Sequence, residues 1–103
     1  MTPLRDLLGR KKKDEGRLTA AQAMAIAERH VAQWDAYPKS PGVFVRQAKF
    51  TQDASGVPVW DVDASPGIDL SCHVLVDDAT GTVKSSALTK GTRVVAQWPS
   101  TSP

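Results

Sequence analysis

Two neighbouring residues, Cys72 and His73, carry the side chains of a nucleophile and a general base. They lie in a stretch of alternating apolar residues, 70–77, which predicts a strand, and successive side chains of a strand point to opposite faces. The thiol is expected to face inward and the imidazole outward, so the two cannot form a dyad. A reactive thiolate also needs an electropositive, partly exposed setting. We interpret Cys72 as a buried structural thiol.

His30 is the other histidine of the chain, and it lies at the edge of a predicted helix stripe. Two histidines and one cysteine without ligand spacing do not indicate a zinc site. We therefore predict no metal, no cofactor and no catalytic residues, and we expect the protein not to be an enzyme.

Carboxylates gather in residues 50–83, which hold six aspartates and neither lysine nor arginine. Three interpretations are open: a solvated sheet face, a surface complementary to a basic partner, and a metal or acid–base site. The single sign of charge favours the partner, because solvated faces usually mix signs. The predicted partner-binding residues are Asp61, Asp63, Asp69, Asp77 and Trp98. For Trp98, near the chain end, the alternative is that it covers the sheet edge.

The first 17 residues form a basic leader. Residues 1–18 hold six basic and three acidic residues, a net charge of +3, so the remaining 85 residues of this +2 chain carry −1. A very short helix is predicted over residues 2–9. The leader's predicted contact residues, for a membrane surface or a partner, are Leu4, Leu7, Leu8, Arg10, Lys11, Lys12 and Lys13. Basic residues near anionic lipid contribute about 1 kcal/mol each. A solubilising leader is the alternative, and specific nucleic-acid binding is not expected because interleaved aromatic residues are missing.

Length and composition limit the class of protein. At 103 residues the chain is expected to form one domain. The single cysteine rules out an intramolecular disulfide and fits a reducing compartment. No apolar run reaches the roughly 18 residues that would span a bilayer, and no signal peptide is recognisable, so we expect a cytoplasmic protein.

One helix is strongly patterned. Thr19 and Gln22 form a capping box, in which each side chain bonds the other residue's backbone N–H. The apolar residues that follow at spacings of three and four are Ala20, Ala23, Met24, Ala27, Val31 and Trp34. The pattern predicts a helix over Thr19 to Trp34 whose alanines allow a sheet to approach closely.

From Val43 onward the period of the apolar residues changes to two. Strands are expected over residues 43–50, 57–63, 70–77, 83–88 and 92–98. Inward positions include Phe44 and Trp60, whereas Val59 is expected to face outward. Three turns are each expected to open with an aspartate bonded to its own backbone and to close with a positive-φ glycine: 53–56, 63–67 and 78–81.

These elements predict an α+β fold, with one N-terminal helix packed on a four- to five-stranded antiparallel meander sheet. The expected organisation is a mobile basic leader over 1–17, a single α+β domain over 18–98 and a frayed tail over 99–103.

The helix start Thr19-Ala-Ala-Gln-Ala-Met-Ala-Ile-Ala-Glu resembles the "A-x-x-I-A" helix of PepSY-like domains. Val59-Trp-Asp-Val62 resembles their "Y/W-x-V" strand, and the segment 73–83 resembles their closing "V-x-V-D-x-x-T-G-x-V" hairpin. The outline, which is also cystatin-like, is similar to small bacterial immunity proteins that neutralise polymorphic toxins. The resemblance covers residues 18–88 and implies a binding role.

Taken together, the sequence predicts a non-catalytic protein-binding domain, an inhibitor or immunity-type antagonist whose acidic sheet face docks on a basic partner such as a toxin or peptidase. One alternative is an assembly module of a larger complex that uses its edge strand or its basic leader. A small enzyme is the remaining alternative. The oligomeric state is left open.

Overall fold

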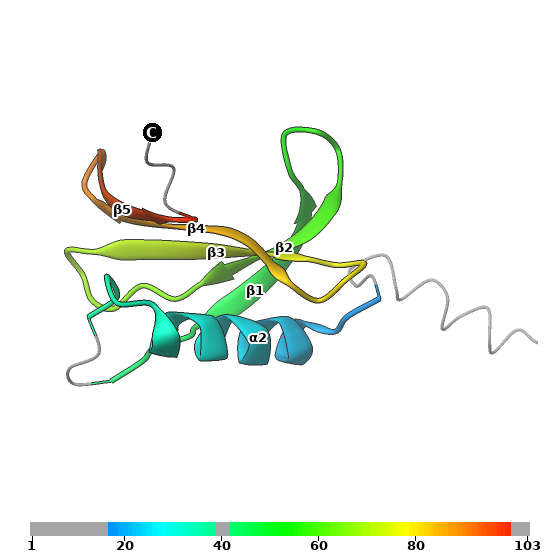
Figure 1. The fold of residues 1–103 in the computed structure, drawn as a ribbon, viewed down its shortest axis with the longest axis horizontal. Helices are drawn as coiled ribbons and strands as arrows, with labels where there is room; N and C mark the ends of the chain where they lie inside the picture. Colours follow the sequence, from blue (N-terminus) through cyan, green and yellow to red (C-terminus); the bar gives the residue numbers. More distant parts are fainter. Residues whose placement is uncertain (1–16, 39–41, 100–103) are drawn as a thin grey trace, which may run out of the picture.

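The computed structural model describes residues 17–38 and 42–99, which form one helix and a five-stranded sheet (Figure 1). The short helix predicted over 2–9, the leader contacts predicted at residues 4–13 and residues 100–103 of the tail lie outside the described residues. The predicted α+β class is confirmed.

The helix, α2 (Ala20–Gln33), begins at the predicted capping box. The N–H of Gln22 donates to Thr19 Oγ1 at 3.1 Å, and the N–H of Thr19 donates to Gln22 Oε1 at 2.9 Å. At its other end, Trp34 leaves helical geometry and its N–H donates to the carbonyl of Val31. The capping box and the apolar stripe together therefore located both ends of the helix to within a residue.

The strands form a meander in which each strand pairs antiparallel with the next. Their bounds are β1 (Gln47–Gln52), β2 (Pro58–Asp63), β3 (Ser71–Asp77), β4 (Val83–Lys90) and β5 (Arg93–Trp98). One face of the sheet, here called the inner face, packs on α2 (Figure 1). The helix packs against β1, β2, β3 and β4, so β5 is the strand farthest from its support.

The core lies between α2 and the inner face. Ala23, Ala27 and Val31 of the helix are fully buried. On the sheet, the buried side chains of this cluster are Trp60, Val62, Cys72, Val74, Val76 and Leu88. Small residues on the helix let these large sheet residues approach its backbone, as the stripe of alanines predicted.

A hydroxyl anchors the loop that follows α2. Tyr37 is buried, and its OH donates to the carbonyl of Ala64 at 2.6 Å and accepts from the N–H of Phe44 at 3.3 Å. Burial is the largest cause that raises the pKa of Tyr37, so the phenol stays a donor at neutral pH. The contact ties the segment after the helix to both sides of the β1–β2 pair.

Two inward–outward predictions were wrong. Phe44 was expected to share the inner face, but β1 begins only at Gln47 and Phe44 is 40% exposed, because the ladder with β2 ends at the Gln47–Asp63 pair. Val59 was expected to be solvated, but it is fully buried outside the helix-facing cluster.

The burial of Val59 follows from a bend in the sheet. In a flat sheet β1 and β4 lie about 14 Å apart, three strand spacings. Yet Lys84 Nζ on β4 lies 3.0 Å from Asp53 Oδ2 in the β1–β2 turn. The β1–β2 hairpin therefore curls over the outer face (Figure 1), and Val59 lies on that face within the curled hairpin.

The turn over 78–81 is built by a different aspartate from the one predicted. Asp77 Oδ1 accepts from the N–H groups of Ala79 and Thr80, at 2.8 and 3.0 Å, and Gly81 has the expected positive φ of 73°. Asp78, predicted to open this turn, instead points inward. In the longer β2–β3 connection, Asp63 does bond Ser65, but Gly67 has no positive φ.

Asp78 is 6% exposed and joins three segments. Its Oδ1 accepts from the backbone N–H groups of Arg17 and Leu18 and from Trp60 Nε1, each at 3.0 Å, and Oδ2 accepts from Arg17 at 2.8 Å. Burial acts to raise the pKa of Asp78, but the bonds from Arg17, Leu18 and Trp60 outweigh it and lower the pKa. Arg17, the last residue of the predicted leader, is thereby attached to the domain.

We predict that Ala27→Leu destabilises the fold by about 1–3 kcal/mol, because the added atoms overpack a fully buried contact with the sheet. Denaturant unfolding measures the change. Ala25→Leu, on the exposed face of the same helix, is the matched control and should change stability by less than about 0.5 kcal/mol. Equal stability of Ala27→Leu and wild type would contradict the burial of this position.

We also predict that Asp78→Asn lowers the free energy of unfolding by about 1–3 kcal/mol at neutral pH. The NH₂ group of the asparagine would face the N–H of Arg17, donor against donor, and the remaining hydrogen bonds would lose their ionised acceptor. Asp77→Asn should be nearly neutral, since asparagine also opens such turns. A lowered carboxyl pKa adds stability above the unfolded pKa, about 3.9, that is lost as pH falls through the folded pKa. The difference in free energy of unfolding between wild type and Asp78→Asn, measured by denaturant titration, should therefore become smaller in acid. A difference in free energy of unfolding that does not change with pH would show that Asp78 is not ionised in the folded protein.

Candidate functional site

Asp61, Asp63 and Asp77 lie on the outer face of the sheet. The strand register pairs Asp61 with Lys49, Asp63 with His73 and Asp77 with Val59. A lysine from outside the acidic window thus lies directly opposite Asp61, so the uniform charge of the sequence segment is not uniform on the surface.

Asp61 and Asp63, and Asp53 in the β1–β2 turn, all bind neighbouring groups. Asp61 Oδ1 lies 2.8 Å from His73 Nδ1. Asp63 Oδ1 accepts from Ser65 N–H at 3.0 Å and from its hydroxyl at 2.6 Å, and these bonds lower the pKa of Asp63 against the opposing effect of burial. Asp53 has a pKa of about 2, because it accepts from Val57 N–H and pairs with Lys84. These aspartates hold turns and strand ends together.

Asp69 lies apart from the other predicted residues. It is exposed in the β2–β3 connection beside Ile68, which is 99% exposed. The two residues help to line a shallow hollow of about 250 Å³ with Pro38 and Leu70. Asp69 therefore contributes charge at one end of the sheet and not to its outer face.

Cys72 and His73 are separated as expected. Cys72 is fully buried, and burial, with a smaller effect of Asp63, raises the pKa of its thiol to about 12. His73 is exposed on the other face, where it meets Asp61. Within residues 17–38 and 42–99, no three His, Cys, Asp or Glu side chains are grouped so that they could hold a metal ion.

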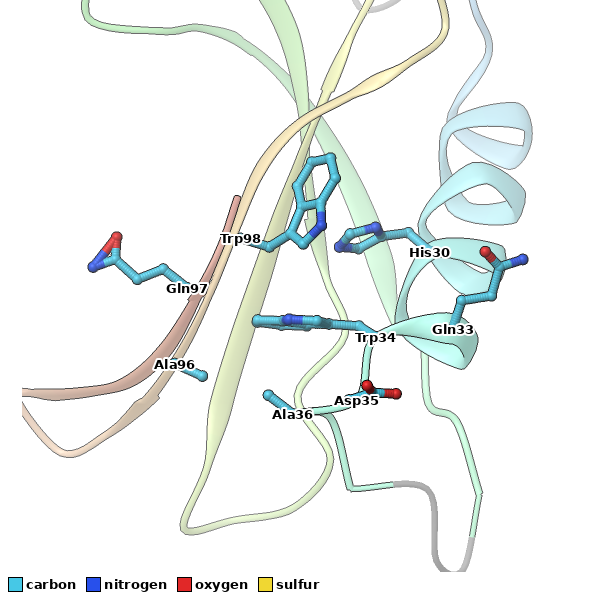
Figure 2. A pocket seen from close by; sticks show the side chains of 8 residues that line it. All are labelled: His30, Gln33, Trp34, Asp35, Ala36, Ala96, Gln97 and Trp98. Atoms are coloured by element: carbon cyan, nitrogen blue, oxygen red, sulfur yellow. The ribbon is translucent and has the colours of Figure 1, made fainter. Parts of the chain in front are cut away.

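A different set of side chains encloses a hollow at the end of the helix. It opens where the C-terminal end of α2 faces the edge strand β5, and its volume is about 650 Å³ (Figure 2). We call it the Trp34–Trp98 groove. Its lining residues are His30, Gln33, Trp34, Asp35, Ala36, Ala96, Gln97 and Trp98.

Three rings form the wall of the groove. The His30 ring stacks on Trp34, with centroids 5.7 Å apart, and meets Trp98 edge-on at 4.7 Å. His30 Nε2 lies 2.9 Å from the hydroxyl of buried Ser86. Burial lowers the pKa of His30, so this imidazole is neutral at neutral pH. Both tryptophans are only partly buried, and they offer indole surface at the edge of the fold.

Trp34 was expected on the inward stripe of the helix, and it is partly buried against the core cluster. For Trp98 the sequence left two positions open, an exposed contact residue or a cover for the sheet edge. The register pairs Trp98 with Ser86 and Ala96 with Leu88, and both partners are buried on the inner side of the sheet. Alternation along β5 could have shown that Trp98 points toward the helix, but the outward position of β5 beyond the helix has no signal in the sequence.

Comparisons with protein-family models, with curated proteins and with solved structures found no match. The resemblance to PepSY-like domains and to immunity proteins therefore stays a prediction. Among the described residues, no helix is both long enough and apolar enough to cross a membrane.

We predict that Cys72 reacts slowly with a thiol reagent in the native protein and rapidly in denaturant, because both its burial and its raised pKa keep the thiolate scarce. The measurement is the labelling rate by mass spectrometry. A native rate equal to that of an unfolded peptide thiol would show that the inner face of β3 is open to solvent.

Proposed function

We propose that this protein is a non-catalytic protein-binding domain, an inhibitor or immunity-type antagonist of a partner with a basic surface. The observation that carries the proposal is the Trp34–Trp98 groove, which is lined by two partly exposed indoles, one from the end of the helix and one from the edge strand. A cytoplasmic setting belongs to the proposal, since one unpaired cysteine suits a reducing compartment.

Tryptophan is the residue type that most often dominates the energy of protein interfaces. It provides a large, rigid apolar area and an N–H donor, and residues whose truncation costs 2 kcal/mol or more are enriched in Trp, Tyr and Arg. Indoles that a folded domain leaves partly exposed in a hollow therefore mark a binding surface better than charged residues on a flat face do.

The acidic outer face has a supporting part in this proposal. Asp61, Asp63 and Asp77 lie on this face, and Lys49 is the one lysine or arginine paired with any of the three in the described strand register. Such a face attracts a basic partner over a distance and speeds association more than it lengthens the lifetime of the complex. The groove supplies the contact, and the outer face supplies steering.

The separation of Cys72 from His73 and the structural bonding of the aspartates favour binding over catalysis. A nucleophile and a base must lie within hydrogen-bond reach of one another. Here the thiol lies in the core and the imidazole lies on the opposite face of the strand.

An assembly module is a second candidate, favoured by the surface of β5. Val94 and Val95 are each 51% exposed on this edge strand. An exposed apolar edge strand is a ready template for pairing with another chain. This candidate predicts that changes at Val94, and not at the groove, abolish association.

We predict that Trp98→Ala weakens binding to the partner at least about 30-fold, the loss that corresponds to 2 kcal/mol. Proteins captured from a lysate of the source organism by the immobilised wild type would be identified and their affinities measured. Val94→Ser, on the same strand but paired with Thr89, is the matched control and should bind as wild type does. Circular dichroism checks that both variants are folded.

Equal binding by wild type and Trp98→Ala would overturn the proposal. Loss with Val94→Ser alone would favour the assembly module. The variant Asp61→Lys, on the outer face, should slow association at low salt and have little effect at high salt, because salt screens exposed charges.

A further inference from the structure

The electrostatic features of the Trp34–Trp98 groove are all negative in sign. Of its eight lining residues, Asp35 carries the one formal charge, since His30 is held neutral by burial. The groove also lies at the C-terminal end of α2, where the summed peptide dipoles place about half a negative charge. Both features favour a cation and disfavour an anion.

The rings reinforce this preference. The face of an indole is negative, and tryptophan is the aromatic side chain that attracts cations most strongly. Figure 2 shows the Trp34 ring edge-on, with Trp98 on one side and Ala36 and Asp35 on the other. A planar group stacked on Trp34 would therefore lie close to the Asp35 carboxylate, and the small side chains of Ala36 and Ala96 leave room for it.

We propose that the groove receives an arginine side chain of the partner protein, with its guanidinium stacked on Trp34 and paired with Asp35, and its methylene stem against Ala36 and Ala96. This inference rests on the proposed function and names the chemistry of the contact. The groove's volume of about 650 Å³ lies within the range of about 300–1,000 Å³ typical of ligand sites.

Arginine suits the groove better than lysine does. Its guanidinium is flat, is weakly hydrated and carries donors in a fork that matches a carboxylate, so one group can stack on an indole and bond Asp35 together. The ammonium of lysine is compact and strongly hydrated, and it gains less from a flat aromatic wall. An apolar side chain would make no favourable electrostatic contact with Asp35 or with the C-terminal end of the helix.

The test is a titration of the ¹⁵N-labelled protein with N-acetyl-arginine methylamide, followed through the indole N–H signals. The protein has three tryptophans, and Trp60 is an internal control, because its Nε1 is bonded to Asp78 in the core. Signals of Trp34 and Trp98 should shift and saturate, while that of Trp60 stays in place. The neutral isostere N-acetyl-citrulline methylamide, at matched ionic strength, should give at most weak shifts.

Two variants examine the carboxylate. Asp35→Asn should weaken binding of the arginine probe up to about fivefold, since an exposed ion pair contributes up to about 1 kcal/mol. Glu28→Gln, which removes an exposed charge from the same helix outside the groove, should leave the affinity unchanged.

Equal shifts with the arginine and citrulline probes, or no shift with either, would overturn the arginine contact. In both cases a partner whose capture still depends on Trp98 would leave the proposed function standing with an apolar contact in the groove. Conversely, the arginine probe could bind saturably while the Trp98→Ala variant captures the partner as well as the wild type does. That result would support the arginine site but would show that it has no role in the proposed function.

Discussion

The buried carboxylate of Asp78 is the interaction on which the arrangement of the two layers depends. It receives backbone N–H groups of Arg17 and Leu18, just before α2, and the indole N–H of Trp60 in the centre of β2, while its own backbone begins the β3–β4 turn. One ionised group thus sets where the helix starts on the sheet. A buried charge persists only when hydrogen bonds replace the lost water, and here four contacts do so.

The position of the helix start determines where the helix ends and, with it, the groove. Fourteen residues of α2 span about 21 Å at 1.5 Å per residue. The helix packs on β1 to β4, and Tyr37 then directs the chain back toward Ala64. The edge strand β5 continues the sheet beside the helix end, so Trp34 and Trp98 border a hollow there instead of closing a core. The groove is a consequence of a sheet wider than its supporting helix.

The acidic window shows how a local charge count misleads. Its six aspartates lie within one sequence segment, but five of them bond backbone N–H groups or side chains that build turns and join strands: Asp53, Asp61, Asp63, Asp77 and Asp78. Lys84 and Lys49, which flank the window, return to it through the sheet. Aspartate is favoured at turns because its short side chain bonds the backbone two residues onward, and a meander of short strands needs many turns.

The sequence by itself determined the elements of this protein. The capping box of Thr19 and Gln22, the helical stripe and the alternation over 70–77 are local signals, because they depend on residues within a few positions of one another. Only the tertiary structure decided that Asp78 turns inward while Asp77 builds the turn, that the β1–β2 hairpin bends over Val59, and that Trp34 and Trp98 meet at one groove. Each of these depends on which distant segments pack together. From local sequence alone, two neighbouring aspartates have the same preference for a turn, and the face on which a valine lies is not decided until the register between strands is set.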